Sequence, residues 1–209
     1  EDHGPRPHPP ASGNDAARRR VKKNVRRHQQ VHGRGNVLRG STGRLRALCP
    51  AIPTPNMYNG MIPVAINNDQ YEGSKSCGAC IEGKHKGETE FKAYVMDECP
   101  ECGHGDLDFG VDGRSSPYSD GRWEVEWQFV PCPGASENPS FIFEGSNDWY
   151  WKLQPRGLSS PVTRLWVDGE KATKTIDNFF VIEGNFAKSE TVKVKTAEGN
   201  VIKNLTVAR

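Results

Sequence analysis

Residues 93–109 read AYVMDECPECGHGDLDF. In this stretch a run with β-strand character delivers Asp97, a Cys-x-x-Cys loop follows, and a second group of carboxylates arrives at Asp106 and Asp108. Acidic side chains at strand ends, beside a loop held by cysteines, are typical of a cleft that binds polysaccharide. The same cysteine loop also fits one half of a zinc site. The predicted function depends on which of these two interpretations holds.

The cysteines bear on both interpretations. The chain contains six of them, Cys49, Cys77, Cys80, Cys99, Cys102 and Cys132. The two Cys-x-x-Cys pairs are eighteen residues apart, which fits a four-thiolate zinc ribbon. Combined with a basic tail, such a ribbon would make a nucleic-acid-binding module. An even set of six cysteines instead suits three disulfides, and a zinc ribbon does not need the carboxylates at Asp106 and Asp108. We therefore expect disulfides, with no metal and no other cofactor.

Composition is consistent with a secreted β protein. The 209 residues include 22 Gly and 15 Pro, which is typical of turn-rich β structure. No apolar run approaches the roughly 20 residues of a transmembrane helix. The stretch that begins at Glu1 shows no secretory leader, so we expect a chain that is cytosolic or already processed. Disulfides favour an oxidising, extracellular compartment, and a glycosylation sequon at Asn204 adds to that expectation.

The first 31 residues differ from the rest of the chain. They carry eight Lys and Arg against three acids, whereas residues 32–209 carry twenty against twenty-three. They hold almost nothing to bury, so we predict a disordered basic tail over residues 1–31. Its basic runs fit an anionic polymer such as pectin, or dibasic processing sites. A solvated leader without a role in the mature fold is the alternative.

Two strand-rich units follow the tail, predicted at residues 32–133 and 138–209. In the first, residues 122–129 alternate strictly, with Trp123, Val125, Trp127 and Phe129 on one face. This pattern predicts a half-buried antiparallel strand with that face inward. A Pro- and Gly-rich linker separates the units, and six short strands in the second predict a small β-sandwich.

The motifs of both units resemble those of expansins. The first unit carries Cys77-Gly-Ala-Cys80, Val95-Met-Asp97-x-Cys99-Pro, Gly105-x-Leu-Asp108-Phe, and a Gly121-x-Trp-x-Val-x-Trp strand ending in Val130-Pro-Cys132. The second carries EGSNDWYWKLQPR at residues 144–156, followed by Pro161-Val162, and is similar to the carbohydrate-binding domain of microbial two-domain expansins. Together the motifs cover about residues 33–207.

This resemblance implies an all-β fold: a six-stranded double-psi β-barrel followed by an immunoglobulin-like β-sandwich of the family 63 carbohydrate-binding type. It also implies the disulfides Cys49–Cys77, Cys80–Cys132 and Cys99–Cys102. The sequence departs from the family at the cleft. The family's cleft Thr corresponds to Thr42 or Asn36 or is missing, and Cys99 stands where the family has an aromatic residue.

The resemblance assigns the cleft acids. Asp97 and Asp108 match the family's paired aspartates, and Asp108 matches the catalytic acid of related family 45 endoglucanases. Those hydrolases take a base from the first barrel strand, but this chain has no Asp or Glu between Asp15 and Asp69. We therefore expect Asp97 to tune and orient Asp108, because two nearby carboxylates raise the proton affinity of one of them. Asp106 is the weaker alternative, since it also fits a turn cap.

The resemblance also assigns an aromatic platform for stacking on sugar rings. Two consecutive aromatics of the family align with Trp149 and Tyr150, and Trp151 is a further candidate that also suits the core. The third platform ring falls near residues 177–180, where Phe179 is the expected substitute and Phe180 the alternative.

We predict a secreted, monomeric protein that loosens walls containing cellulose or matrix glucans without hydrolysis, with no membrane or nucleic-acid partner. A weak endoglucanase and the zinc-ribbon nucleic-acid binder are the two alternatives.

Overall fold

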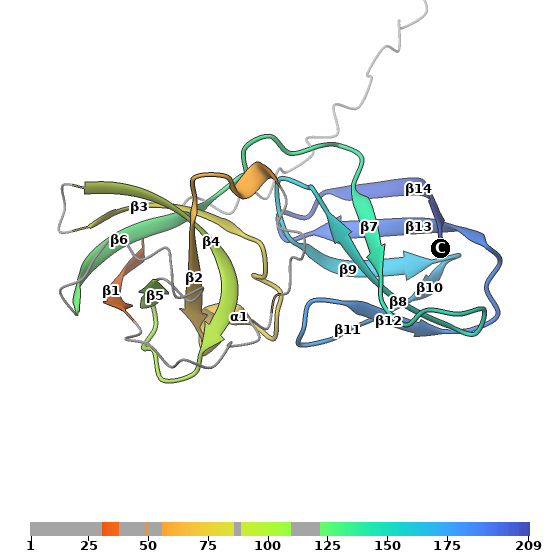
Figure 1. The fold of residues 1–209 in the computed structure, drawn as a ribbon, viewed down its shortest axis with the longest axis horizontal. Coiled ribbons are helices and arrows are strands. Elements are labelled where there is room, and N and C mark those ends of the chain that lie inside the picture. The colour runs from red at the N-terminus through yellow and green to blue at the C-terminus, as the bar shows by residue number, and fades with distance from the viewer. Residues whose placement is uncertain (1–30, 38–48, 50–55, 86–88, 110–121) are drawn as a thin grey trace, which may run out of the picture.

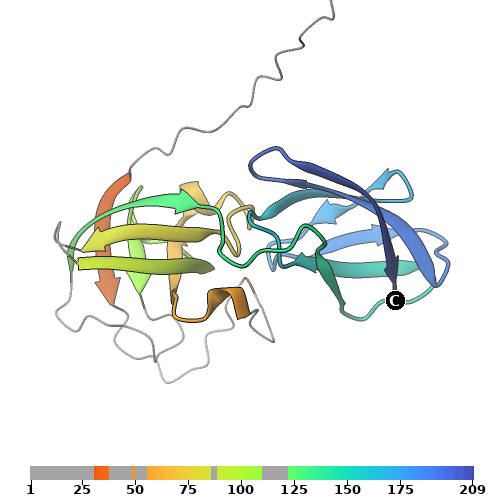
Figure 2. The ribbon, with the colours of Figure 1, turned by 90° about the horizontal axis from the view of Figure 1, so that it is seen from above.

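The computed structural model describes residues 31–37, 49, 56–85, 89–109 and 122–209. Residues 1–30 of the predicted basic tail and Thr42 lie outside these residues, and Val31, the last residue of the predicted tail, begins the first strand. The described part of the chain is almost entirely β-structure and forms two domains joined end to end (Figure 1). Figure 2 shows the same two bodies from above, with a connection between them that runs from the end of β6 to the start of β7. None of the helices in these residues has the length and apolar character needed to span a bilayer.

The first domain is a closed six-stranded barrel, as predicted. Its strands are β1 (Val31–Val37), β2 (Ile62–Asn67), β3 (Cys80–His85), β4 (Thr89–Cys99), β5 (Leu107–Phe109) and β6 (Trp123–Val130). They close in the order β1-β5-β2-β4-β3-β6, with β1 parallel to β5, β2 parallel to β4 and the other neighbours antiparallel. A short 3-10 helix, η1 (Asn56–Tyr58), precedes β2, and α1 (Asn68–Tyr71) follows it.

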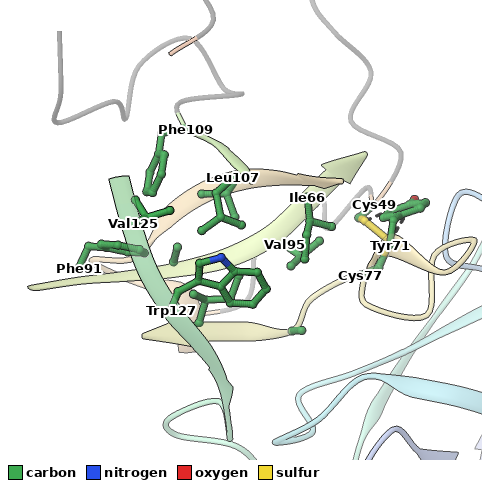
Figure 3. Close-up of a cluster of buried hydrophobic side chains, with 14 of the residues drawn as sticks. Cys49, Ile66, Tyr71, Cys77, Phe91, Val95, Leu107, Phe109, Val125 and Trp127 are labelled. Carbon is green, nitrogen blue, oxygen red and sulfur yellow. Dashed lines mark hydrogen bonds between the residues drawn. A yellow bond between two sulfur atoms is a disulfide. The ribbon is translucent and has the colours of Figure 1, made fainter. Parts of the chain in front are cut away.

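Alternation along the strands builds the barrel core (Figure 3). On β6, Trp123, Val125 and Trp127 are buried, as their spacing predicts. Phe129, the last residue of this row, is 37 % exposed. Its ring packs edge-on against Trp127 at 5.1 Å between centroids, so Phe129 continues the inward row only at the rim of the core.

Three disulfides pair all six cysteines, Cys49–Cys77, Cys80–Cys132 and Cys99–Cys102. These are the pairs that the family resemblance implies. Because each Cys-x-x-Cys sulfur is bonded to another sulfur, the four inner cysteines do not form a zinc ribbon. Three disulfides in a chain of this size are typical of extracellular proteins.

The second domain is a sandwich of two four-stranded sheets. One has the order β10-β9-β13-β14 and the other the order β11-β12-β8-β7. The strands are β7 (Ser140–Phe143), β8 (Tyr150–Arg156), β9 (Val162–Val167), β10 (Glu170–Lys171), β11 (Thr173–Lys174), β12 (Phe180–Glu183), β13 (Ser189–Thr196) and β14 (Val201–Ala208). Inward residues of both sheets form a second core, which includes Trp151, Leu165, Phe180, Val192 and Val194.

The two domains meet at Tyr71, which is fully buried at the end of α1. Its hydroxyl donates to the backbone oxygen of Ile176 at 2.9 Å. The hydroxyl of Ser74 donates to the backbone oxygen of Thr175 at 2.7 Å. The Cys49–Cys77 disulfide lies beside the same phenol ring (Figure 3), with Cys77 Sγ 3.4 Å from the hydroxyl oxygen. The turn between β11 and β12 is thereby tied to the barrel.

Candidate functional site

The two predicted cleft acids lie in one row across the barrel surface. Ala65 on β2 is paired with Asp97 on β4 and, on its other side, with Asp108 on β5. Laterally paired residues point to the same face of a sheet. Because Val64 and Ile66, on either side of Ala65, belong to the barrel core, this row faces outward. We call Asp97, Ala65 and Asp108 the carboxylate row.

A β-bulge places Asp97 in this row. The β2–β4 register shifts between Val64 and Ala65, so that Met96 is passed over and Asp97 becomes the partner of Ala65. Without the extra residue, alternation would turn Asp97 toward the core. Asp97 is half-buried, and its Oδ1 accepts a hydrogen bond from the backbone N–H of Glu98 at 2.9 Å.

The two acids of the row are not neighbours. Adjacent strands lie about 4.8 Å apart, so one intervening strand separates the backbones of Asp97 and Asp108 by about 10 Å. Side chains on the outer surface of a barrel diverge, which does not bring the carboxyl groups closer. The register therefore argues against direct tuning of Asp108 by contact with Asp97. Asp108 is itself only 3 % exposed.

The other neighbour of Asp108 is a residue of β1. The parallel β1–β5 register pairs Asp108 with Asn36, which is one of the two candidates for the family's cleft Thr. This strand is the source of the base in the related hydrolases, and the paired residue here carries an amide instead of a carboxylate. The other candidate, Thr42, lies outside the described residues.

Asp106 has a different role from Asp108. Its Oδ1 accepts the backbone N–H of Arg34 at 2.6 Å, and its Oδ2 accepts that of Gly103 at 3.1 Å. The carboxylate thus closes the turn after the Cys99–Cys102 disulfide and ties this turn to β1. Its hydrogen bonds fit the turn-capping role that the sequence left open.

We predict that Asp106→Ala lowers the free energy of unfolding by about 1–2 kcal/mol, because two backbone donors lose their acceptor. Thermal unfolding measured by circular dichroism checks this value. Asp106→Asn keeps one acceptor oxygen and is expected to cost less. Equal stability of Asp106→Ala and the wild type would contradict the role as a cap.

The predicted platform begins in a tight turn. Asn147 and Tyr150 are bridged to each other, which leaves Asp148 and Trp149 at the tip. The side-chain oxygen of Asn147 accepts a hydrogen bond from the backbone N–H of Trp149 at 2.8 Å. The backbone oxygen of Trp149 accepts one from the backbone N–H of Gly184 at 3.0 Å. The backbone of Trp149 is held firmly while its side chain stays 67 % exposed, the most exposed large apolar residue of the described chain.

Alternation along β8 divides the remaining aromatic candidates. Tyr150 is half-buried and lies on the outer face of the sheet together with Lys152, whereas Trp151 is fully buried between the sheets. Phe179 is only 5 % exposed, and the ammonium of Lys152 lies 4.7 Å from the centre of its ring. A covered ring cannot stack on a polymer, so the predictions for Trp151 and Phe179 as binding residues are wrong for this structure. The alternative ring, Phe180, is also buried.

The carboxylate row and the platform sheet adjoin at the domain junction. Burial raises the pKa of the Tyr71 hydroxyl, and the negative charges of Asp97, Glu98 and Asp177 raise it further. Asp97 belongs to the row, whereas Asp177 lies in the β11–β12 turn of the sandwich. Tyr71 also donates to the backbone oxygen of Ile176 in that turn, so the junction lies near both candidate regions.

A hollow at the junction lies away from these residues. It is lined by barrel residues that include the stacked rings of Tyr58 and Tyr94, and by sandwich residues that include Gln154 and Arg156. Neither acid of the carboxylate row and no platform ring lines it. No motif in the sequence pointed to this hollow, because its two walls come from different domains.

The similarity to known proteins extends over both domains. No family model matches the sequence. The chain is 28 % identical over 170 residues to Expansin-YoaJ of Bacillus subtilis (strain 168), covering 75 % of this chain and 69 % of that protein.

The fold is similar to two crystal structures of the Clavibacter michiganensis expansin, one of the apo protein and one of a mutant in complex with cellohexaose. The TM-scores are 0.65 and 0.68, with 22 % identity over 86 % of this chain and 93 % of the other in each case.

Proposed function

The chain fits the expansin family, and on that premise we propose that it loosens walls containing cellulose by binding glucan chains without hydrolysing them. The observation that carries this proposal is the carboxylate row, in which Asp108 has Ala65 on one side and Asn36 on the other. Among the described residues, neither barrel-strand neighbour of Asp108 is an acid, and this arrangement suits a hydrogen-bond donor to sugar better than a hydrolase.

The barrel would hold glucan at Asp108. Asp108 is only 3 % exposed, and in its neutral form it would donate a hydrogen bond to sugar. Such a bond to a glucan oxygen competes with contacts between glucan chains. Hydrolysis requires in addition a base or nucleophile across the scissile bond, at about 5–10 Å between carboxyl groups. Asp97 lies beyond Ala65, so one strand separates the backbones of Asp97 and Asp108 by about 10 Å.

The sandwich would anchor the protein on cellulose. Trp149 and Tyr150 would stack on the apolar faces of glucose units, in support of which the expansin of Clavibacter was solved with cellohexaose. Trp149 is presented by a turn that is held by hydrogen bonds on both sides, so its ring would lose little conformational freedom on binding.

The remaining parts of the proposal concern the setting of this activity. We infer an extracellular, monomeric protein that acts on cellulose and matrix glucans and needs no cofactor. Pectin is a further partner if the basic tail binds it. Asn204 is exposed on β14 and is the proposed glycosylation site, since the sequon Asn-Leu-Thr continues along the same strand.

A reducing-end assay separates this proposal from the endoglucanase alternative. We predict that the purified protein releases no reducing sugar from a soluble β-glucan, because the row supplies an acid without a base. A parallel sample incubated with a known endoglucanase shows that the substrate is accessible. Reducing ends that rise with the amount of protein, and that disappear in Asp108→Asn, would favour the hydrolase.

A further inference from the structure

The middle of the platform sheet is charged. Lys152 on β8 lies between Glu144, which follows β7, and Asp177, in the turn between β11 and β12. Its Nζ is 2.5 Å from Glu144 Oε2 and 2.9 Å from Asp177 Oδ2, and it covers the ring of Phe179. We call Glu144, Lys152 and Asp177 the charged triad. It brings together residues from three elements on the outer face of one sheet.

The triad lies next to the exposed aromatic residues. Tyr150 and Lys152 are two residues apart on one strand, which corresponds to about 7 Å along the outer face. On the neighbouring strand β12, Glu183 is paired with Tyr150 and Val181 with Lys152. An oligosaccharide that stacks on Trp149 and Tyr150 and follows β8 therefore meets the triad next.

The triad is accessible, and its contacts favour the charged forms of Lys152 and Asp177. The side chains of Lys152, Asp177 and Glu144 are 21 %, 35 % and 59 % exposed. Hydrogen bonds to Glu144 and Asp177 raise the pKa of Lys152. Burial acts to raise the pKa of Asp177, but hydrogen bonds from Thr175 and Lys152 hold it below its usual range.

The chemistry of the triad matches hydroxyl groups. An ammonium has three donors, of which two point to the carboxylates, and each carboxylate offers several acceptor positions. A sugar hydroxyl both donates and accepts, so it can bind a cation and a carboxylate side by side. The triad has a net charge of −1, and the exposed Glu183 beside Tyr150 adds another negative charge. An anionic sugar would be repelled here, whereas a neutral one would not.

We propose that the charged triad is a polar subsite which hydrogen-bonds the hydroxyls of a neutral glucan stacked on Trp149 and Tyr150, and which selects against uronic-acid polymers. This inference rests on the proposed function of the platform. The main alternative, which we call the movable roof, is that the Lys152 side chain moves away from Phe179 and exposes this ring as a third stacking residue. The two ideas predict opposite results when Lys152 is replaced.

The test is the affinity of the full chain for cellohexaose in solution, measured by isothermal titration calorimetry for the wild type and four variants. Lys152→Met keeps the aliphatic cover over Phe179 and removes the ammonium, and we expect it to weaken binding at least fivefold. Lys152→Arg keeps the charge and the donors, and it is expected to recover most of the affinity. Lys193→Met is the matched control, because Lys193 covers the Trp166 ring on the opposite sheet in a similar way, at 4.1 Å. It is expected to leave the affinity unchanged.

The fourth variant, Glu144→Gln, tests selectivity. It keeps hydrogen-bonding atoms at the triad and removes one negative charge. We expect the ratio of its affinity for a galacturonic-acid hexamer to its affinity for cellohexaose to exceed the ratio of the wild type, with tighter binding of the uronic-acid hexamer. This variant also keeps the proposal falsifiable if Lys152→Met fails to fold, which circular dichroism would reveal.

Different outcomes would overturn the polar subsite, its selectivity, or the function of the platform. Unchanged or tighter cellohexaose binding by Lys152→Met would overturn the polar subsite, and tighter binding would favour the movable roof. Equal losses in Lys152→Met and Lys193→Met would overturn it in favour of unspecific charge effects. No gain for the uronic-acid hexamer in Glu144→Gln would overturn the selectivity. A wild type that does not bind cellohexaose would refute the proposed function of the platform, and the subsite with it.

Discussion

Replacing Asp108 by Asn is expected to slow the extension of cellulose-containing wall strips while leaving cellulose binding intact. The amide has nearly the shape of the carboxyl group, so the buried site remains filled. Its N–H groups are weaker donors than the O–H of a neutral carboxylic acid, so the hydrogen bond to a glucan oxygen weakens. Asp108 is 3 % exposed and lies between Ala65 and Asn36, so no other acid in the carboxylate row can take its place directly. Creep of wall strips under constant load and depletion of protein by suspended cellulose are the two measurements.

Asp106→Asn is the matched control for this experiment. It changes the same functional group two residues away, at a carboxylate whose oxygens accept backbone N–H groups of Arg34 and Gly103. We expect Asp106→Asn to be somewhat less stable and still active in the folded state. Creep by Asp108→Asn at the wild-type rate would refute the assignment of Asp108.

Replacing Trp149 by Ala is expected to have the second large effect, a loss of affinity for cellulose. If stacking on sugar resembles stacking on bases, the loss is about 1–3 kcal/mol. This corresponds to roughly 5- to 150-fold weaker binding to cellulose. The turn itself should persist, because the hydrogen bonds that hold residue 149 use its backbone. Binding isotherms on microcrystalline cellulose measure the effect.

Trp166 provides the control for the loss of an indole ring. It lies on β9 in the opposite sheet, is only half-buried, and is covered by Lys193. Trp166→Ala should leave cellulose binding close to that of the wild type. If both variants lose affinity equally, or if Trp149→Ala binds normally, the platform does not begin at Trp149.

The sequence predicted the parts of the site that depend on local pattern or on family motifs. Alternation placed Trp123, Val125 and Trp127 in the barrel core, and the motifs implied the three disulfides correctly. The sequence also left a core position open for Trp151, and the structure places its side chain in the sandwich core. Trp149 escapes the alternation because it occupies a turn.

What the sequence did not predict depends on contacts between distant segments. The separation of Asp97 from Asp108 follows from the barrel order, which inserts β2 between β4 and β5. The placement of Asp97 in the row also needs the bulge opposite Val64 and Ala65. Neither feature has a signal in residues 93–109 alone.

The charged triad is a similar case. Lys152 and Asp177 are 25 residues apart in the chain and meet only through the β11–β12 turn. Phe179 was expected at the surface because the resemblance places the third platform ring near residues 177–180, but the ammonium of Lys152 covers its ring. A ring shielded by a side chain from another strand cannot be recognised from the residues next to it.

The central claim is that this protein binds glucan chains and loosens the wall without cleaving them. One experiment on the wild-type protein tests it most directly. A cellulose-containing wall strip is held under constant load in buffer, the protein is added, and both the length of the strip and the reducing ends in strip and buffer are recorded. We predict that the strip extends while the number of reducing ends stays at the level of the buffer control. Extension that is matched by new reducing ends, or no extension at all, would contradict it.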